Sequence, residues 1–220
     1  VVDCSGRFLP SPAAERYARA ILHAGSLGTE AGTAVARLLS GAANPSGKLP
    51  MTIPRTTGQI PLYYNVKRPG SAVARTQFKG YEEQLVTPLY PFGYGLSYTE
   101  FALENIVLSA DTLGPGETVT LRAELRNCGN RAGAQVVQLY LQAVASNPTR
   151  PVRELKAFQR VELDPGASCV LAFTLGEKEL GCYLPTGVWT VPSGIYRLAL
   201  GFDSTAAFNA QLTYAKSGKS

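Results

Sequence analysis

From about residue 101 onward, apolar residues occur in short, often alternating runs, and this pattern constrains the fold more than any other feature. Seven runs share it: "NIVLSA", "TVTLRAELRN", "QVVQLYLQA", "ELKAFQRVEL", "SCVLAFTL", "VWTV" and "IYRLALGF". Gly, Pro and Asn clusters separate several of them, as turns do between strands. Seven short strands over about 110 residues are typical of an immunoglobulin-like or fibronectin III-like sandwich. We therefore predict an all-β sandwich over residues 101–214, with Trp189, Tyr140 and Phe158 as core or edge aromatics, and a tail over 215–220.

The first 60 residues predict a different class, α/β. "VVDC" is a short apolar strand. A helix is expected from Ser11 as N-cap to Gly25 as its end, with Tyr17 on its apolar face. A second helix is expected from Thr29 to Gly41, with a buried stripe of Val35, Leu38 and Leu39. One strand and two helices cannot bury a sheet, so we expect residues 1–60 to be the end of a larger α/β domain.

Residues 42–100 carry little periodicity, and prolines and glycines exclude long helices there, so we place the connector between the two domains at residues 61–100. We predict a connector that ends in "PLYPFGYGLSYTEF" (88–101). Gly93 and Gly95 begin a G-x-G pattern, but Tyr98 stands where a dinucleotide-binding loop requires Gly. The favoured interpretation is a crowded structural joint made of Pro91, Phe92, Gly93, Tyr94, Gly95 and Tyr98. Prolines would fix its path, and glycines would allow close backbone approach.

Composition excludes several functions. Hydrophobic residues make up 45% and charged residues 17% of the chain, which is ordinary for a globular protein and unlike a disordered one. The net charge is +5, but the cations are scattered, so no nucleic-acid partner is expected. No apolar run is long enough to cross a bilayer, so no membrane partner is expected either. The four cysteines do not have the spacing of a zinc site, so no metal or cofactor is expected. They are either free thiols or include one disulfide, and the sequence does not decide between these.

The residues alone do not identify an active site. His23 is the only histidine, and no serine in a strand-turn-helix elbow accompanies it. Paired carboxylates are the remaining option, with Glu30, Glu82–Glu83, Glu100 and Glu104 as candidates. A charged loop residue is usually only solvated, and no pair follows from spacing.

The connector nevertheless resembles a known family. "NPSGKLPMTIPRTTGQIPLYYN" (44–65) and "PLYPFGYGLSYTEF" (88–101) resemble the C-terminal part of family 3 glycoside hydrolases, the β-glucosidases and β-xylosidases. "LRNCGNRAGAQVVQLYL" (125–141), "RPVRELKAFQRVELDPG" (150–166) and "VPSGIYRLALGFDS" (191–204) are similar to the fibronectin III-like domain of that family, in the same order.

The resemblance implies a barrel, an α/β sandwich domain and then a fibronectin-like domain, of which this chain would hold the end of the second and all of the third. It implies retaining hydrolysis of terminal β-linked sugars by a carboxylate nucleophile and an acid/base carboxylic acid. Both would precede Val1, so no catalytic role passes to any residue here, and this chain alone is expected to be inactive. The implied partners are the missing domains and a β-linked oligosaccharide or aryl glycoside.

The resemblance also suggests a border of the substrate cleft. The loop "KRPGSAVARTQFKGYEEQ" (67–84) would contribute Arg75, Tyr81 and Glu82. Glu30 is a further candidate, since Gly28, Glu30 and Gly32 match the family's "AWYPGEEGG". The family's aromatic residue is Gly25 here, however, and a first-turn carboxylate is also favoured by the helix dipole.

Two functions of different classes remain. The first is the C-terminal part of a retaining exo-acting β-glycosidase, stabilising and bordering an active site built elsewhere; glucoside and xyloside specificity stay open. The second is a non-catalytic fibronectin III-like scaffold that binds carbohydrate or protein, which exposed aromatics on one strand face would favour.

Overall fold

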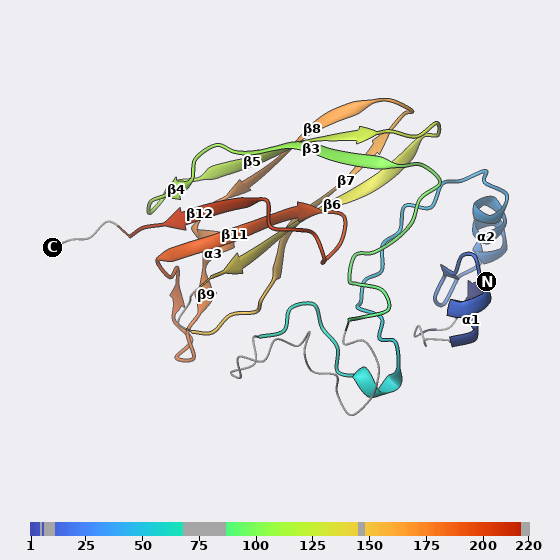
Figure 1. The fold of residues 1–220 in the computed structure, drawn as a ribbon, viewed down its shortest axis with the longest axis horizontal. Helices are drawn as coiled ribbons and strands as arrows, with labels where there is room; N and C mark the ends of the chain where they lie inside the picture. The colour runs from blue at the N-terminus through green and yellow to red at the C-terminus, as the bar shows by residue number, and fades with distance from the viewer. Residues whose placement is uncertain (5, 7–11, 68–86, 145–147, 217–220) are drawn as a thin grey trace.

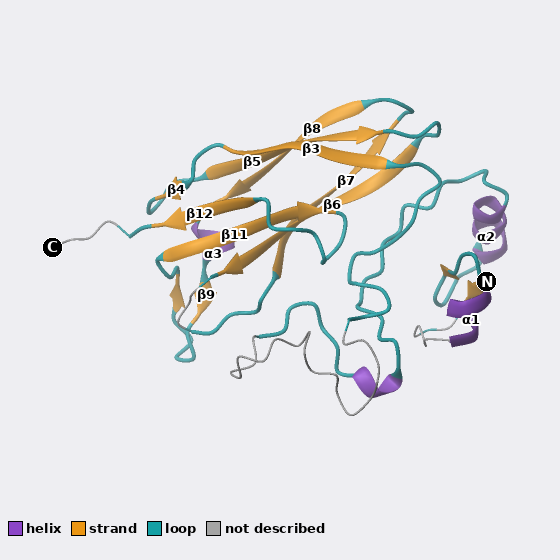
Figure 2. Ribbon diagram, in the orientation of Figure 1, coloured by secondary structure: helices purple, strands orange, loops and turns teal. Residues whose placement is uncertain are grey.

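The computed structural model describes residues 1–4, 6, 12–67, 87–144 and 148–216. Figure 1 shows a β-sandwich that occupies most of the molecule and a small α/β segment beside it, joined by a long irregular connector. Figure 2 shows that most helical residues lie in the α/β segment and its connector, whereas the sandwich is almost entirely strand. An α/β segment followed by an all-β sandwich is the fold class that the sequence predicts.

The α/β segment is small. Its elements are β1 (Val2–Asp3), α1 (Pro12–Tyr17), β2 (Leu22–His23) and α2 (Ala31–Leu39). β1 and β2 pair in parallel, with Asp3 opposite His23, and the His23 Nδ1 lies 2.8 Å from the Asp3 carboxylate. From here on, the connector is the irregular chain between α2 and β3 (Phe101–Leu108). Its described residues add only the short 3₁₀ helix η1 (Thr57–Gln59).

Three predictions for this segment are wrong. Tyr17 does not lie on a buried apolar face, since it is 76% exposed. The first helix ends at Tyr17 instead of Gly25, because residues that favour helix locally instead form β2 against β1. In α2, Leu39 does not complete a buried stripe, since its side chain is 64% exposed while Val35 and Leu38 are half-buried. Ser11, the expected N-cap, lies outside the described residues.

The sandwich consists of two sheets. Their strands are β3 (Phe101–Leu108), β4 (Thr112–Leu113), β5 (Val119–Asn127), β6 (Gly133–Ala143), β7 (Glu154–Leu163), β8 (Ser168–Leu175), β11 (Gly194–Gly201) and β12 (Ala210–Tyr214). One sheet has five strands in the order β4-β12-β11-β6-β7, and the other has three in the order β3-β5-β8. β12 pairs antiparallel with β11. The sequence pattern missed two strands of this sheet, β12 and the two-residue β4.

Between β8 and β11 lie α3 (Glu177–Leu180) and a hairpin of β9 (Cys182–Tyr183) and β10 (Trp189–Thr190). The run "VWTV" therefore does not join either large sheet: β10 pairs with β9 alone. Trp189 and Phe158 are exposed, whereas Tyr140 is fully buried.

The inner faces of the two sheets form one apolar core. Its central members are buried Leu and Val residues from strands of both sheets, including Leu121, Leu125, Val137, Leu139, Leu141, Leu171, Leu198 and Leu212. Each strand contributes alternate residues, which is why the sequence shows a period of two.

Strand β6 departs from this alternation, because nearly all of its residues are buried. Val137, Leu139 and Leu141 point into the core. The alternate residues Gln138, Tyr140 and Gln142 are also buried, so the outer face of the strand is covered as well. The connector covers Gln138 and Tyr140 through Gly93 and Tyr64, and Gln142 donates to the Val152 carbonyl just before β7.

Candidate functional site

The predicted joint runs antiparallel to an earlier part of the connector. The Leu49 amide donates to the Tyr94 carbonyl and the Gly93 amide donates to the Leu49 carbonyl, each at 2.8 Å. Further along, the Ile53 amide donates to the Tyr90 carbonyl, also at 2.8 Å. The Ile53 side chain is only 1% exposed. The two halves of the connector therefore form one ribbon, whose backbone groups satisfy each other.

Gly93 brings this ribbon onto β6. Its φ of +83° is a left-handed conformation, and a Cβ atom there would lie 2.3 Å from the Gln138 Oε1. The Gln138 Nε2 donates to the carbonyls of Phe202 (2.6 Å) and Gly93 (3.3 Å), and the Tyr140 hydroxyl donates to the Gln138 Oε1 (2.5 Å). A buried amide is thus satisfied at both ends only because position 93 has no side chain.

The aromatic residues of the joint pack against one another. The rings of Tyr64 and Phe92 are stacked at 4.5 Å, and Tyr64 meets the Tyr140 ring edge-on at 5.8 Å. Tyr90 and Tyr94 form a second stack at 5.4 Å. Burial raises the pKa of Tyr140, and with it the cost of ionising the hydroxyl that Gln138 accepts from. In each stacked pair, one face of each ring is covered by the other ring, so that face is not available to a stacked ligand.

Asn44 fastens the start of the connector to the sandwich. Its Nδ2 donates to the Ala132 carbonyl at 2.9 Å, just before β6. Its Oδ1 accepts from the Ser97 hydroxyl (2.9 Å) and from the Tyr98 amide (2.8 Å). One side chain therefore holds three points that are 53 to 88 residues away from it in the sequence.

Tyr98 and Arg131 extend this attachment to α2. The Tyr98 hydroxyl donates to the Leu38 carbonyl at 2.8 Å, near the end of the helix. The Arg131 guanidinium lies 5.5 Å from the Tyr98 ring centroid and donates to the Gly41 carbonyl. The Leu38 carbonyl also accepts from the Gly41 amide at 3.1 Å, so both contacts are made at the turn that ends α2.

A charged group lies at the other side of the joint. The Lys48 ammonium donates to the Gly95 carbonyl at 2.7 Å; burial lowers the pKa of Lys48, and the Asp203 carboxylate opposes that effect. The Arg153 guanidinium lies 5.4 Å from the Tyr140 ring and donates to the Ala206 carbonyl. Burial lowers the pKa of Arg153 as well, and the Asp203 carboxylate again opposes that effect. Lys48 and Arg153, from distant segments, therefore both interact with the Asp203 carboxylate.

A hollow of about 770 Å³ opens beside the joint. Its lining is apolar and aromatic, with Pro50, Met51, Thr52, Ile60, Pro61, Leu62, Tyr63, Tyr64, Asn65 and Phe92. Its described lining includes no Asp, Glu or His, so these residues offer no acid or base for hydrolysis. Met51 and Tyr63 are 43% and 62% exposed, so the hollow presents apolar side chains to solvent.

The predicted border of the substrate cleft is only partly placed. Glu30 is the N-cap residue of α2, and its exposed side chain makes no capping hydrogen bond. Arg75, Tyr81 and Glu82 lie outside the described residues, so the structure does not bring this set together. Of the predicted joint residues, Pro91, Phe92, Gly93 and Tyr94 lie in the ribbon described above. Gly95 and Tyr98 follow it, and they contact Lys48 and the end of α2 respectively. Sequence reasoning missed Asn44, Gln138 and Arg131; the one available signal was that "QVVQLYLQA" lacks charge on either face, as strands covered on both sides do.

Two classes of site are absent from the described part of the chain. No group of three or more His, Cys, Asp or Glu side chains there is arranged to hold a metal ion. No described helix is long and apolar enough to cross a membrane.

Comparison with known families identifies both parts of the chain. Residues 1–98 match the glycosyl hydrolase family 3 C-terminal domain, and residues 135–204 match a fibronectin type III-like domain. A periplasmic β-glucosidase of Salmonella typhimurium is 39% identical over 93% of this chain and 27% of its own length.

Solved structures agree. A β-glucosidase from Erythrobacter marinus is 37% identical, with a TM-score of 0.90 over 97% of this chain and 28% of its own. A β-glucosidase variant from Listeria innocua, in complex with laminaribiose, is 36% identical, with a TM-score of 0.86 over 96% of this chain and 30% of its own. The chain thus spans little more than a quarter of these proteins. It belongs to glycoside hydrolase family 3 and corresponds to the C-terminal part of its enzymes.

Proposed function

We propose that this chain is the C-terminal part of a retaining, exo-acting β-glycosidase, in which it stabilises and borders an active site built mainly by residues of the N-terminal domains. The observation that carries the proposal is the match along nearly the whole chain to a β-glucosidase, at 39% identity. The two family models also follow each other in the order that the resemblance implies.

The geometry of the joint and of the hollow favours a structural role over a catalytic one. Retaining hydrolysis needs two carboxyl groups about 5 Å apart, one as nucleophile and one as acid/base. The described residues that line the hollow beside the joint supply neither. The joint instead ties α2 to the five-stranded sheet through Asn44, Tyr98 and Gln138. The task of these residues is to hold the α/β segment at a fixed position, so that the sandwich braces the domain to which that segment belongs.

A chimera tests the proposal. This chain would replace the corresponding region of the Salmonella β-glucosidase, and hydrolysis of p-nitrophenyl β-glucoside and β-xyloside would be measured. We expect the chimera to hydrolyse at least one substrate and the 220-residue chain alone to hydrolyse neither. A chimera that folds but is inactive on both would contradict the proposal.

Hydrolysis by the isolated chain would also contradict it, since it would mean that a carboxylate pair lies within these residues. Glu30→Gln and Glu82→Gln, made in the chimera, address the predicted border of the cleft. A border role predicts a raised KM with little change in kcat. Glu117→Gln, in the turn before β5, is the matched control.

The alternative, a non-catalytic fibronectin III-like scaffold, receives support from one feature. Two aromatic side chains are exposed side by side on the β9–β10 hairpin. They do not compete with the first function, because they lie on the sandwich and away from the joint.

A further inference from the structure

The β9–β10 hairpin is a small, well-closed element at the end of the sandwich farthest from α1 and α2 (Figure 1). The Leu184 amide donates to the Val188 carbonyl at 2.8 Å, and the Gly187 amide to the Leu184 carbonyl at 2.9 Å. Gly187 has a φ of +82°, which the tight turn requires. Tyr183 and Trp189 are direct cross-strand partners, so both side chains lie on one face of the hairpin.

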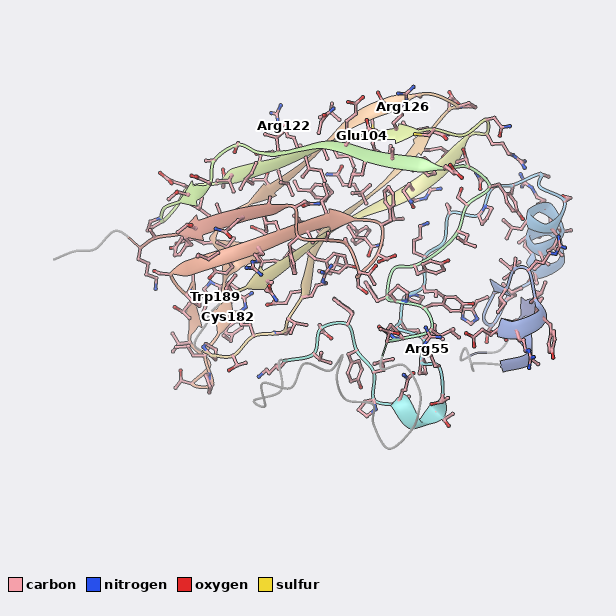
Figure 3. The ribbon with its side chains drawn as sticks, in the orientation of Figure 1. Arg55, Glu104, Arg122, Arg126, Cys182 and Trp189 are labelled. Carbon is pink, nitrogen blue, oxygen red and sulfur yellow. The ribbon has the colours of Figure 1, made fainter. Side chains whose placement is uncertain are left out.

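The indole of Trp189 is held in place although it is 44% exposed. It rests on Gly181: a Cβ atom there would lie 2.1 Å from the Trp189 Cζ2. Only a glycine therefore allows the ring to lie against the backbone. Figure 3 labels Trp189 beside Cys182, at the edge of the sandwich.

Tyr183 completes an aromatic corner. Its ring, 68% exposed, meets the indole at a centroid distance of 5.0 Å and an angle of 68°, the edge-to-face arrangement that aromatic pairs prefer. Two rigid rings nearly at right angles thus face solvent. Exposed aromatics that are already fixed lose little conformational entropy when a ligand packs on them.

We propose that Tyr183 and Trp189 form a corner-shaped platform for a β-linked glucan, in which one aromatic ring stacks on the face of a pyranose ring and the other contacts its edge. The electron-rich face of an aromatic ring attracts the positively polarised C–H groups that line one face of a sugar with equatorial hydroxyls. Such a ligand is neutral and needs no charged partner. The choice of a β-glucan rests on the proposed glycosidase function.

The size of the platform argues against a protein as its occupant. A stable protein interface covers about 800 Å² and 20 residues per partner. The hairpin presents only Tyr183, Trp189 and the neighbouring Val188 as exposed large apolar side chains. One or two sugar rings match that extent.

The chain offers a direct measurement, because Trp189 is its single tryptophan. The 220-residue chain would be titrated with soluble laminarin, and tryptophan fluorescence followed. We expect a saturable change, and Tyr183→Ala, which keeps the reporter, should weaken binding by about three- to tenfold, the worth of one aromatic contact. Trp189→Ala would be scored by retention on an insoluble β-glucan.

Phe158→Ala is the matched control. Phe158 is 64% exposed on the outer face of β7 and makes no aromatic contact within the described residues, so its loss should leave laminarin binding unchanged. Far-UV circular dichroism of each variant confirms that the sandwich is folded.

Three results would overturn the platform: no saturable change with the unmodified chain, equal binding by all variants, or dimerisation that Tyr183→Ala abolishes. The last would make the hairpin a self-contact. The outcome is separable from the proposed function. In the chimera, Tyr183→Ala should leave hydrolysis of p-nitrophenyl β-glucoside unchanged, so binding and hydrolysis can fail independently.

Discussion

The sandwich and the α/β segment are held in their shapes by different physical means. The sandwich buries a core of Leu, Val, Phe and Tyr side chains between two sheets. In the described part of residues 1–52, by contrast, no side chain is buried. The segment is instead kept in place by hydrogen bonds and ring contacts made by Asn44, Tyr98 and Arg131. The first region is stable through hydrophobic burial, and the second depends on its attachment.

The same substitution in each region should give the largest contrast. Leu139→Ala removes a fully buried side chain and should lower the free energy of unfolding by about 2–5 kcal/mol. Leu39→Ala, at a position that is 64% exposed in α2, should change it by less than about 0.5 kcal/mol. Urea unfolding followed by far-UV circular dichroism, to which both the strands and α2 contribute, measures both. Equal effects would mean that α2 is buried by a contact that the structure does not show.

Two glycines with similar positive φ, Gly93 in the joint and Gly166 in the turn before β8, should differ by a smaller amount. Gly93→Ala and Gly166→Ala both place a side chain at positive φ, which costs about 1–2 kcal/mol. Gly166 has open space around it, whereas Gly93 faces Gln138. Gly93→Ala should therefore cost a further 1–3 kcal/mol, roughly, for disrupted buried hydrogen bonds. If thermal unfolding gives the same loss for both variants, Gln138 adapts freely and the joint is looser than described.

Asn44→Ala should loosen the α/β segment while the sandwich stays folded. Losing three hydrogen bonds should cost about 1–2 kcal/mol of local stability, which corresponds to roughly 5- to 30-fold faster hydrogen exchange of the amides in α2. Amides of β6 should exchange as before. Asn65→Ala, an exposed residue outside this network, is the control. Faster exchange throughout the sandwich would show that the two regions unfold together.

The smallest expected effect is on how the free energy of unfolding of the sandwich depends on acidic pH. Burial alone would raise the pKa of Glu154, but hydrogen bonds from Arg150 (2.8 Å) and Lys156 (3.0 Å) outweigh burial and lower it. A lowered pKa adds stability above the unfolded value of about 4.3, and that stability is lost as the pH falls through the folded value. Glu154→Gln should therefore flatten the dependence of unfolding free energy on pH below about 4.3. Glu162→Gln, with its side chain 72% exposed, should leave that slope intact.

The sequence predicted what depends on local pattern. Alternation revealed the sandwich strands because each sheet has one face in the core, and the comparisons confirm the family. β12 escaped because its five residues bury only Leu212 and Tyr214, too short a pattern to stand out. The end of α1 was misplaced because β2 forms through pairing with a distant strand.

The candidate site was less accessible to sequence reasoning. Gly93 and its aromatic neighbours indicated a crowded joint. Gln138 and Asn44, the polar residues that attach this joint to the sandwich, lie 45 and 49 positions from Gly93 in the sequence. Such partners follow from the tertiary fold and not from composition. The cleft-border role of Glu30, Arg75, Tyr81 and Glu82 stays a prediction for the kinetics of the chimera.

The burial of β6 on both faces bears on how this part of the protein could be exchanged by recombination. A crossover at residue 100 would transfer every strand of the sandwich. It would, however, separate Tyr140 and Gln138 from Tyr64 and Gly93, the connector residues of this chain that contact them. A crossover just before Asn44 would carry that cover along. The portable unit is therefore larger than the strands suggest, and homologous exchange should favour breakpoints in the loop after α2.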